Sequence, residues 1–283
     1  MRIPQGFVGL LLMVAFGLLA PASAFAGQPR DWRVSAPRDE GTYLTLDFLL
    51  GAVQATLDQE IQIYGSANQL TPRATALVAL PFASGAVGFD LRLVVLSLGM
   101  DVGGQSVWRG MACKEGDPCD RRELRVKDFA GDFQPETFPY WEGRGQLLLP
   151  FNDYSLFVAQ SFFRASGAPE GFYDYQNAIV RDGNLLTTNV MLFLKHKDWG
   201  AFAPMWQHMN YSLYGKTINQ FNVGFTFLTR AGLVRRDDMI AVRMMFHDAN
   251  LLGGDNQSDT FGNYRLLRGP VTLLLAYSST IPL

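Results

Sequence analysis

The chain has 283 residues, 48% of them hydrophobic, which is enough for one large β domain or two ordinary ones. No linker of distinct composition divides it. The formal net charge is −2 and the lysines and arginines are dispersed, which excludes the basic surface of a nucleic-acid-binding protein.

Membrane-spanning helices are not expected in the body of the chain. No internal stretch reaches the roughly 18 uninterrupted apolar residues that such a helix needs. Only helices and closed β-barrels satisfy every backbone N–H and C=O group in lipid. If the mature chain crosses a membrane, it therefore does so as a barrel.

The N-terminus has the parts of a secretory signal peptide. Arg2 supplies a basic start, residues 6–19 form an apolar core, and small residues allow cleavage after Ala24 or Ala26. An uncleaved helical anchor is the alternative. The short apolar core and the cleavage motif favour removal of residues 1–26.

Behind the signal peptide we expect a leader and one domain. Residues 27–40 are polar, contain proline and show no periodicity, so they are predicted to form an extended periplasmic leader. Alternating segments then recur throughout 41–283, which predicts a single β-barrel domain.

The first β segment, 42–64, changes its pattern halfway. Apolar residues occupy even positions up to Leu50 and odd positions from Val53 onward. A bulge at Gly51 or Ala52 within one long strand would exchange the faces in this way. A tight turn at the same place is the alternative, and it would add a strand.

Nine further strands are predicted along the rest of the chain. They cover 73–83, 87–108, 140–151, 154–164, 185–196, 201–213, 217–230, 240–246 and 264–280. Short turns at 83–85, 152–153 and 197–200 alternate with longer connections for most of the chain, as periplasmic turns and outward loops do in outer-membrane barrels. The fold expected is an all-β, antiparallel up-and-down transmembrane barrel of about ten strands, with 8 or 12 as alternatives.

The segment 217–230 shows the clearest alternation. Apolar residues occupy the odd positions, Phe221, Val223, Phe225 and Phe227, while polar and small residues occupy the even positions. Either lipid or a second sheet could cover the phenylalanines, because a soluble sandwich strand has the same period.

The two cysteines of the chain lie close together in sequence. Cys113 and Cys119 flank a Gly-Asp-Pro turn within a charged, irregular segment. An exported protein reaches an oxidising compartment, so we expect a local disulfide. The spacing is not that of a redox CxxC motif, and no histidine cluster accompanies it to indicate zinc.

With its signal peptide, its alternating strands and a final strand that carries Val271, Leu273, Leu275 and Tyr277, the chain resembles Gram-negative outer-membrane β-barrel proteins. The resemblance covers the region from Gly41 onward and implies an outer-membrane location. Members of this class usually end on an aromatic residue, whereas this chain continues to Leu283.

Charged residues at the polar positions of the alternating strands are the candidates for the barrel interior. They are Asp90, Arg92, Glu142, Arg144, Lys195, Arg243 and His247. Mixed signs on neighbouring strands predict ion pairs across a narrow lumen, because an unpaired charge there is costly. These pairs either stabilise a filled interior or line a constricted conduit for ions and small solutes.

A lipid-modifying hydrolase on the same scaffold is the second hypothesis. The His247-Asp248-Ala249-Asn250 segment is similar to the His-x-Ser-Asn segment of lipid A deacylase barrels, but alanine replaces the serine nucleophile. His208 and Ser212 could share a strand face, without an acidic partner placed by the sequence.

The function expected is therefore an outer-membrane barrel that is a narrow channel or a structural protein. The expected partners are the bilayer and small solutes, and neither a cofactor, a metal nor enzymatic activity is expected. A secreted soluble β-sandwich that binds a ligand is the third hypothesis, and it requires a second sheet over Phe221, Val223 and Phe225.

Overall fold

The computed structural model of this protein describes residues 38–49, 52–63, 68–79, 82–107, 136–152, 154–168, 172–174, 177, 179–196, 200–213, 215–231, 238–246 and 271–283. These residues form thirteen strands: β1 (Gly41–Leu49), β2 (Ala52–Gln62), β3 (Asn68–Ala79), β4 (Phe82–Leu93), β5 (Leu96–Val107), β6 (Glu136–Asn152), β7 (Ser155–Ser166), β8 (Phe172–Asp174), β9 (Ile179–His196), β10 (Gly200–Leu213), β11 (Lys216–Arg230), β12 (Met239–Phe246) and β13 (Val271–Pro282).

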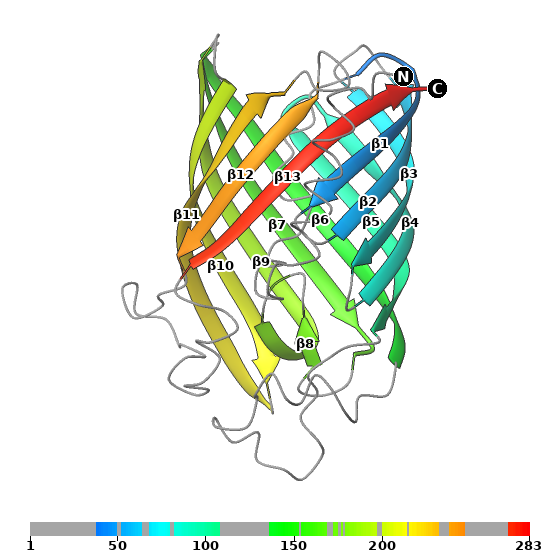
Figure 1. Cartoon of the computed structure of the whole chain (residues 1–283), viewed down its shortest axis with the longest axis vertical. Coiled ribbons are helices and arrows are strands. Elements are labelled where there is room, and N and C mark those ends of the chain that lie inside the picture. The colour runs from blue at the N-terminus through cyan, green and yellow to red at the C-terminus, as the bar shows by residue number, and fades with distance from the viewer. Residues whose placement is uncertain are drawn as a thin grey trace, which may run out of the picture.

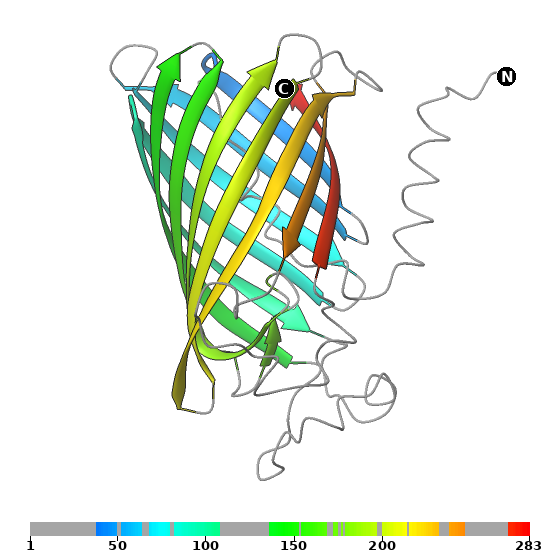
Figure 2. The ribbon, with the colours of Figure 1, turned by 90° about the vertical axis from the view of Figure 1, so that its left-hand side faces the viewer.

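Twelve of the described strands close into a ring, as Figures 1 and 2 show. Each of these strands pairs antiparallel with the strand before it and the strand after it. The exception is β8, which is not part of the ring, so that β7 pairs with β9. β13 and β1 complete the ring, with Tyr43 opposite Pro282 and Leu49 opposite Ala276. The predicted antiparallel up-and-down barrel is confirmed, with twelve strands.

The barrel has two strands more than the ten predicted, because two tight turns divide segments that were each expected to be one strand. β1 ends at Leu49 and β2 begins at Ala52, so the turn alternative for the first segment is correct and the bulge is wrong. The segment expected as one strand over 87–108 is divided between β4 and β5, because the chain reverses at Val94-Val95. The turn predicted at 83–85 is also wrong, since these residues belong to β4.

The two ends of the barrel are distinguishable. β1 begins and β13 ends at one end, here called the terminal end. β5 and β12 end, and β6 and β13 begin, at the opposite end, here called the loop end, which is at the bottom of Figure 1.

Side chains alternate between an apolar outer face and a largely polar inner face. On β4 and β5, Val87 is 64% exposed and Val102 is 53% exposed, whereas the inward Asp101 is 1% exposed. On β11, Val223 is exposed and Phe221, Phe225 and Phe227 are half-buried, while Asn222 and Thr226 are fully buried. No second sheet among the described residues covers these phenylalanines, so the soluble sandwich hypothesis is wrong.

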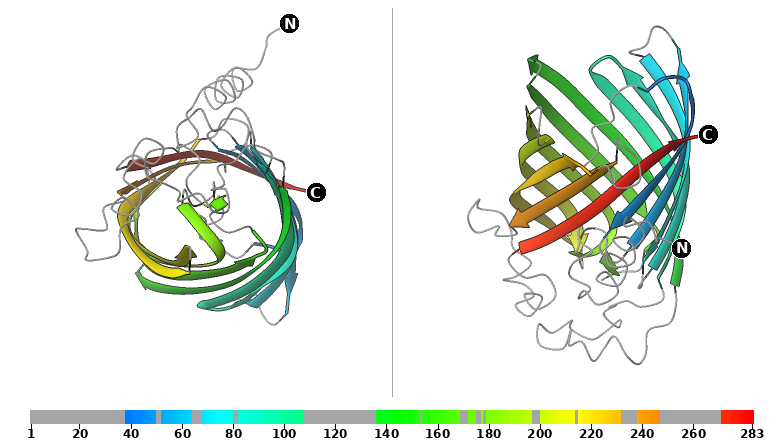
Figure 3. Two further views of the ribbon diagram at one scale, coloured as in Figure 1. Left: turned by 90° about the horizontal axis from the view of Figure 1, so that it is seen from below. Right: turned by 45° about the horizontal axis from the view of Figure 1, so that its top comes forward.

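The short strand β8 stands apart from the wall. It pairs with the first three residues of β9, Ile179–Arg181, and with no other described strand. Figure 3 shows the β8–β9 hairpin inside the ring when the barrel is viewed along its axis from the loop end. Among the described residues, no helix is long and apolar enough to cross a membrane.

Candidate functional site in the barrel lumen

A cluster of six charged side chains lies on the inner face of β3 to β7. Its members are Arg73, Asp90, Asp101, Glu142, Arg144 and Arg164, and we call them the charge cluster. Three positive and three negative groups thus lie together on five neighbouring strands. Pairing of this kind offsets the cost of removing each charge from water.

Two arginines hold two aspartates at the centre of this cluster. Arg73 donates from Nε to Asp101 Oδ1 at 3.1 Å, from Nη2 to Asp101 Oδ2 at 3.0 Å, and from Nη1 to Asp90 Oδ2 at 2.5 Å. Arg144 donates from Nη2 to Asp90 Oδ1 at 3.0 Å and from Nη1 to Asp101 Oδ2 at 2.5 Å. Bidentate bonds of this type fix orientation as well as distance.

Glu142 extends the cluster to β7. It lies 3.5 Å from Arg144 through Oε1, and its Oε2 accepts from Arg164 Nη2 at 2.7 Å and Nε at 3.0 Å. The Arg164 guanidinium also lies over the ring of Tyr140, 4.6 Å from its centroid, within cation–π distance. Glu142 is 1% exposed, so the cluster reaches a fully buried part of the lumen.

Two inward glycines make space for these groups. A Cβ atom at Gly99 would overlap the Asp90 carboxylate and lie 2.7 Å from Arg144 Nη2. A Cβ atom at Gly88 would overlap the Asp101 carboxylate. Any other residue at these positions would therefore displace the ion pairs.

A second buried ion pair holds the β8–β9 hairpin. Arg181 donates from Nε to Asp174 Oδ2 at 2.8 Å, and Asn177 donates to the same oxygen at 3.0 Å. Arg181 also donates to the carbonyl of Gly183. Asp174 and Arg181 are both fully buried, so this hairpin fills part of the lumen with a neutralised pair.

A row of carboxamides crosses the inner face from β6 to β11. Gln146, Gln160, Asn189, Gln207 and Asn222 are successive register partners, and we call them the amide row. On β9 to β11 the row is hydrogen-bonded, since Asn222 donates to Gln207 at 2.8 Å and Gln207 donates to Asn189 at 3.0 Å.

A lumen cavity of about 140 Å³ lies toward the terminal end, against β2 to β7. Gln146 and Gln160 line it together with Arg73, Asp90 and Arg144 of the charge cluster. At this size it has room for on the order of ten water-sized groups. The cavity is thus the place where a small molecule would meet both the charges and the amides.

Arg38 of the leader also lines this cavity. Its Nη1 lies 3.6 Å from Asp58 Oδ2 and 3.9 Å from Glu60 Oε1, and its guanidinium is 5.2 Å from the centre of the Tyr43 ring. Its backbone carbonyl accepts a hydrogen bond from Gln69 Nε2 at 2.5 Å. The end of the leader therefore covers part of the cavity.

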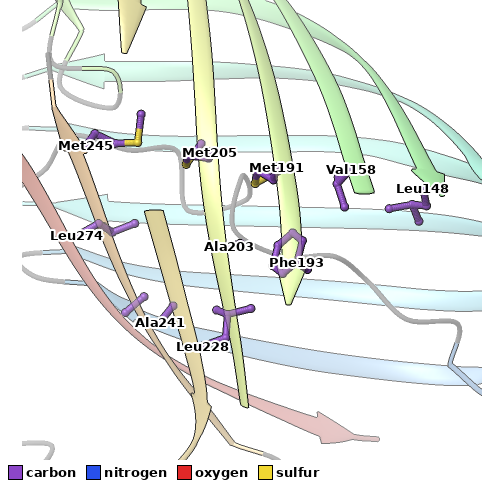
Figure 4. Close-up of a cluster of buried hydrophobic side chains, with 11 residues drawn as sticks. Leu148, Val158, Met191, Phe193, Ala203, Met205, Leu228, Ala241, Met245 and Leu274 are labelled. Carbon is purple, nitrogen blue, oxygen red and sulfur yellow. The ribbon is translucent and has the colours of Figure 1, made fainter. Parts of the chain in front are cut away.

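An apolar cluster fills the opposite side of the lumen near the terminal end (Figure 4). It consists of Leu148, Val158, Met191, Phe193, Ala203, Met205, Leu228, Ala241, Met245, Leu274 and Ala276. All occupy inward-facing positions on β6 to β13, and they lie between the amide row and the terminal end of the barrel. Three methionines, which adapt to irregular gaps, help to close this space.

The predicted interior residues fall in several places. Asp90, Glu142 and Arg144 belong to the charge cluster, and Arg92 lines the cavity. Arg243 is buried on the inner face of β12, where its Nε donates to Thr226 at 3.1 Å. The Lys195 side chain is exposed at the terminal rim, away from the cluster.

Several predictions concern residues outside those that the structure describes. They are His247, the disulfide between Cys113 and Cys119, the signal peptide 1–26 and most of the leader 27–40. They stay predictions.

Sequence reasoning missed Arg73, Asp101 and Arg164 of the charge cluster. On one continuous strand over 87–108, Asp101 would share the odd positions of the apolar residues Val87 to Leu93 and point away from the lumen. The signal was present: apolar residues move from odd positions before Val94 to even positions after Val95. A two-residue turn produces this exchange and turns Asp101 inward.

His208 lies on the outer face of β10 and not in the lumen. Its ring stacks on Phe221 with centroids 4.6 Å apart and on Trp206 at 6.1 Å. Its Nε2 is 3.2 Å from Asn219 Oδ1. Ser212 shares this outer parity, but no hydrogen bond between Ser212 and His208 is formed, so the hydrolase hypothesis gains no support from this histidine.

No metal centre is indicated within the described ranges. They hold no group of three or more histidine, cysteine, aspartate or glutamate side chains placed to bind a metal ion.

The chain matches no family model and no curated protein. Among solved structures it is similar to a protein from work on the in-meso crystallization of membrane proteins, with 11% identity over 86% of this chain and 83% of the other and a TM-score of 0.41. LpxR from Salmonella typhimurium shares 8% identity over 85% of this chain and 100% of its own, with a TM-score of 0.41. The NanC porin shares 8% identity over 85% and 98%, with a TM-score of 0.35. Because these scores are below 0.5, the likenesses carry no argument about function.

Proposed function

We propose that this protein is an integral β-barrel of a Gram-negative outer membrane, with a narrow lumen that admits small polar solutes and ions. The observation that carries the proposal is the orientation of the side chains. Large apolar residues such as Val87 and Val102 are exposed on the outside, while ions and amides are buried inside. A water-soluble barrel of this size would bury the apolar face and expose the polar one.

The secretory signal peptide predicted at the N-terminus fits this location. An exposed aromatic side chain at one rim supports it as well, since Tyr154 is 67% exposed at the terminal end. Aromatic residues are enriched at both interfaces of membrane barrels.

The width of the barrel supports passage of small solutes only. A barrel of eight strands is filled by its own side chains, and barrels of about sixteen enclose a wide aqueous channel. In this twelve-strand ring, the charge cluster, the apolar cluster and the β8–β9 hairpin occupy much of the interior. The cavity beside them suits a constricted path.

Ion conductance in planar bilayers tests the proposal. Insertion of the purified mature protein should give small, discrete conductance steps. Ser97 lines the cavity, so Ser97→Trp should lower the conductance, whereas Leu98→Trp on the outer face of the same strand should not. Silent bilayers with folded, inserted protein would reject passage, and equal conductance of the two variants would reject a path through this cavity.

A further inference from the structure

The charges that line the lumen cavity fall into two sets. Arg73, Asp90 and Arg144 belong to the charge cluster, whose three positive and three negative groups balance one another through contacts of 2.5 to 3.5 Å. The second set, here called the Arg38 set, consists of Arg38, Asp58, Glu60 and Arg92. It holds two positive and two negative groups, so the lining is balanced only while Arg38 is in place.

Arg38 differs from the other arginines of the lining in where it comes from. It precedes β1, which begins at Gly41, whereas the other three belong to β3, β4 and β6 of the wall. Its place is fixed by its contacts with two carboxylates, by the ring of Tyr43 and by the hydrogen bond to its backbone carbonyl. One of the two positive charges of the Arg38 set therefore belongs to the leader and not to the barrel.

The contacts of Arg38 leave its charge accessible to the cavity. Its side chain is 25% exposed, compared with 12% for Arg73 and 9% for Arg144. Its guanidinium lies 3.6 Å and 3.9 Å from the nearest carboxylate oxygens, whereas Arg73 holds Asp101 with two bonds of 3.1 Å and 3.0 Å. A charge that is partly exposed and loosely paired acts on ions that enter the cavity.

Loss of this one charge would change the sign of the Arg38 set. Asp58 and Glu60 would remain with Arg92 as the cation of the set, which leaves one negative charge in excess. Glu60 also accepts a hydrogen bond from Thr71 at 2.6 Å, and this bond holds its carboxylate at the cavity wall. A constriction lined by an excess of one sign attracts ions of the opposite sign and repels the others.

We infer that Arg38 sets the ion selectivity of the lumen, as the counter-charge of Asp58 and Glu60. With Arg38 in place the lining has no excess charge, and without it the lining favours cations. The inference rests on the proposed passage of ions and names the residue that decides which ions pass. Since Arg38 is not part of the wall, the selectivity depends on where the end of the leader lies.

Reversal potentials in planar bilayers test this role, with the full mature protein and a potassium chloride gradient at low ionic strength, where screening is weakest. Arg38→Gln should raise the permeability ratio of potassium to chloride about fivefold, the effect of one unit charge about 4 Å away in water. Arg38→Lys keeps the charge and should give the ratio of the parent.

Two further variants separate charge balance from a change of shape. Glu60→Gln removes a negative charge from the same set and should lower the ratio. The double variant Arg38→Gln, Glu60→Gln has a balanced lining again and should return to the ratio of the parent. Charges that do not line the cavity are the same in all these proteins, so the differences report on the Arg38 set.

Arg230→Gln is the matched control. It removes the same charge at an exposed position of the terminal end that does not line the cavity, so the ratio should not change. Circular dichroism establishes that each variant is folded. Asp58→Asn replaces Glu60→Gln if loss of the hydrogen bond from Thr71 prevents folding.

An unchanged ratio in Arg38→Gln would overturn the inference, as would an equal shift in Arg230→Gln or a double variant that stays as cation-selective as Arg38→Gln. Silent bilayers with folded, inserted protein would reject passage and selectivity together. Conductance with the same ratio in every variant would keep passage and reject the role of Arg38 alone.

Discussion

The interior of the barrel is organised by different interactions on the two sides of the lumen. On β3 to β7 the interior is organised by directional ion pairs, and a cavity persists beside them. On β6 to β13 the terminal half is closed by the apolar cluster, which packs without a fixed hydrogen-bond geometry. Ion pairs specify positions but do not fill volume, whereas apolar side chains fill volume and specify little.

This difference explains why the cavity lies where it does. The charge cluster needs space around its guanidinium groups, and Gly88 and Gly99 provide it. The methionines Met191, Met205 and Met245 fill the space opposite. One side of the lumen therefore keeps a cavity while the other side is filled by apolar side chains.

Removal of one cation should have the largest effect. Arg144→Met leaves Asp90 and Asp101 with a single arginine between them, and loss of one partner from a buried ion pair costs about 3–5 kcal/mol. Urea unfolding in detergent micelles, followed by tryptophan fluorescence, measures the loss. Lys195→Met at the exposed rim is the control and should show no measurable change; equal losses would contradict a structural role for the cluster.

Truncation of the apolar cluster should have the next largest effect. Met191 is 1% exposed inside the barrel, and Met→Ala at a buried site costs about 2–5 kcal/mol. Met100 is 44% exposed on the outer face of β5, where lipid can fill the space, so Met100→Ala should cost much less. The same urea titration compares the two, and a larger loss for Met100→Ala would show that the faces are assigned in reverse.

A methyl group at Gly99 should disturb the charge cluster directly. Gly99→Ala overlaps the Asp90 carboxylate, and overpacking of this kind costs about 1–3 kcal/mol. A Cβ atom at Gly145, on the outer face of β6, meets only Leu98 Cδ2 at 3.9 Å. Unfolding of Gly145→Ala should match the parent, and an equal cost for both alanines would remove the steric explanation.

Arg38→Ala should have the smallest effect on stability. Its contacts with Asp58 and Glu60 are 3.6 Å and 3.9 Å long at a partly exposed site, which is worth at most about 1 kcal/mol. Because Arg38 lines the cavity, its removal should raise the bilayer conductance. Arg230→Ala, an exposed change at the same end of the barrel, should leave the conductance unchanged; an identical conductance for the two variants would exclude Arg38 as an obstruction.

The alternation of apolar and polar residues was enough to predict the barrel and the two faces of β11. This succeeded because the period of two is local and does not depend on distant partners. The turn between β4 and β5 could not be read, since Val94 and Val95 are poor turn residues and no glycine marks it. Val94 adopts a positive φ of 46°, which is rare for a β-branched residue.

Which side chains pair with one another in the lumen depends on the register between strands, and a single sequence does not determine that register. Arg73 meets Asp101 although 28 positions separate them, because β3, β4 and β5 are adjacent in the ring. The β8–β9 hairpin was also missed. β8 has three residues, too few for any periodicity, and the Asp174–Arg181 pair that joins it to β9 is buried.

Spin-label accessibility along β5 tests the membrane assignment most directly. In a Cys113→Ser, Cys119→Ser background reconstituted into lipid, nitroxides are placed one at a time at six positions of β5. We predict that labels at the outward positions Leu98, Met100 and Val102 are relaxed by oxygen, which concentrates in lipid, and that labels at the inward positions Ser97, Gln105 and Val107 are not. Equal access of a water-soluble nickel complex to all six positions would contradict a membrane barrel.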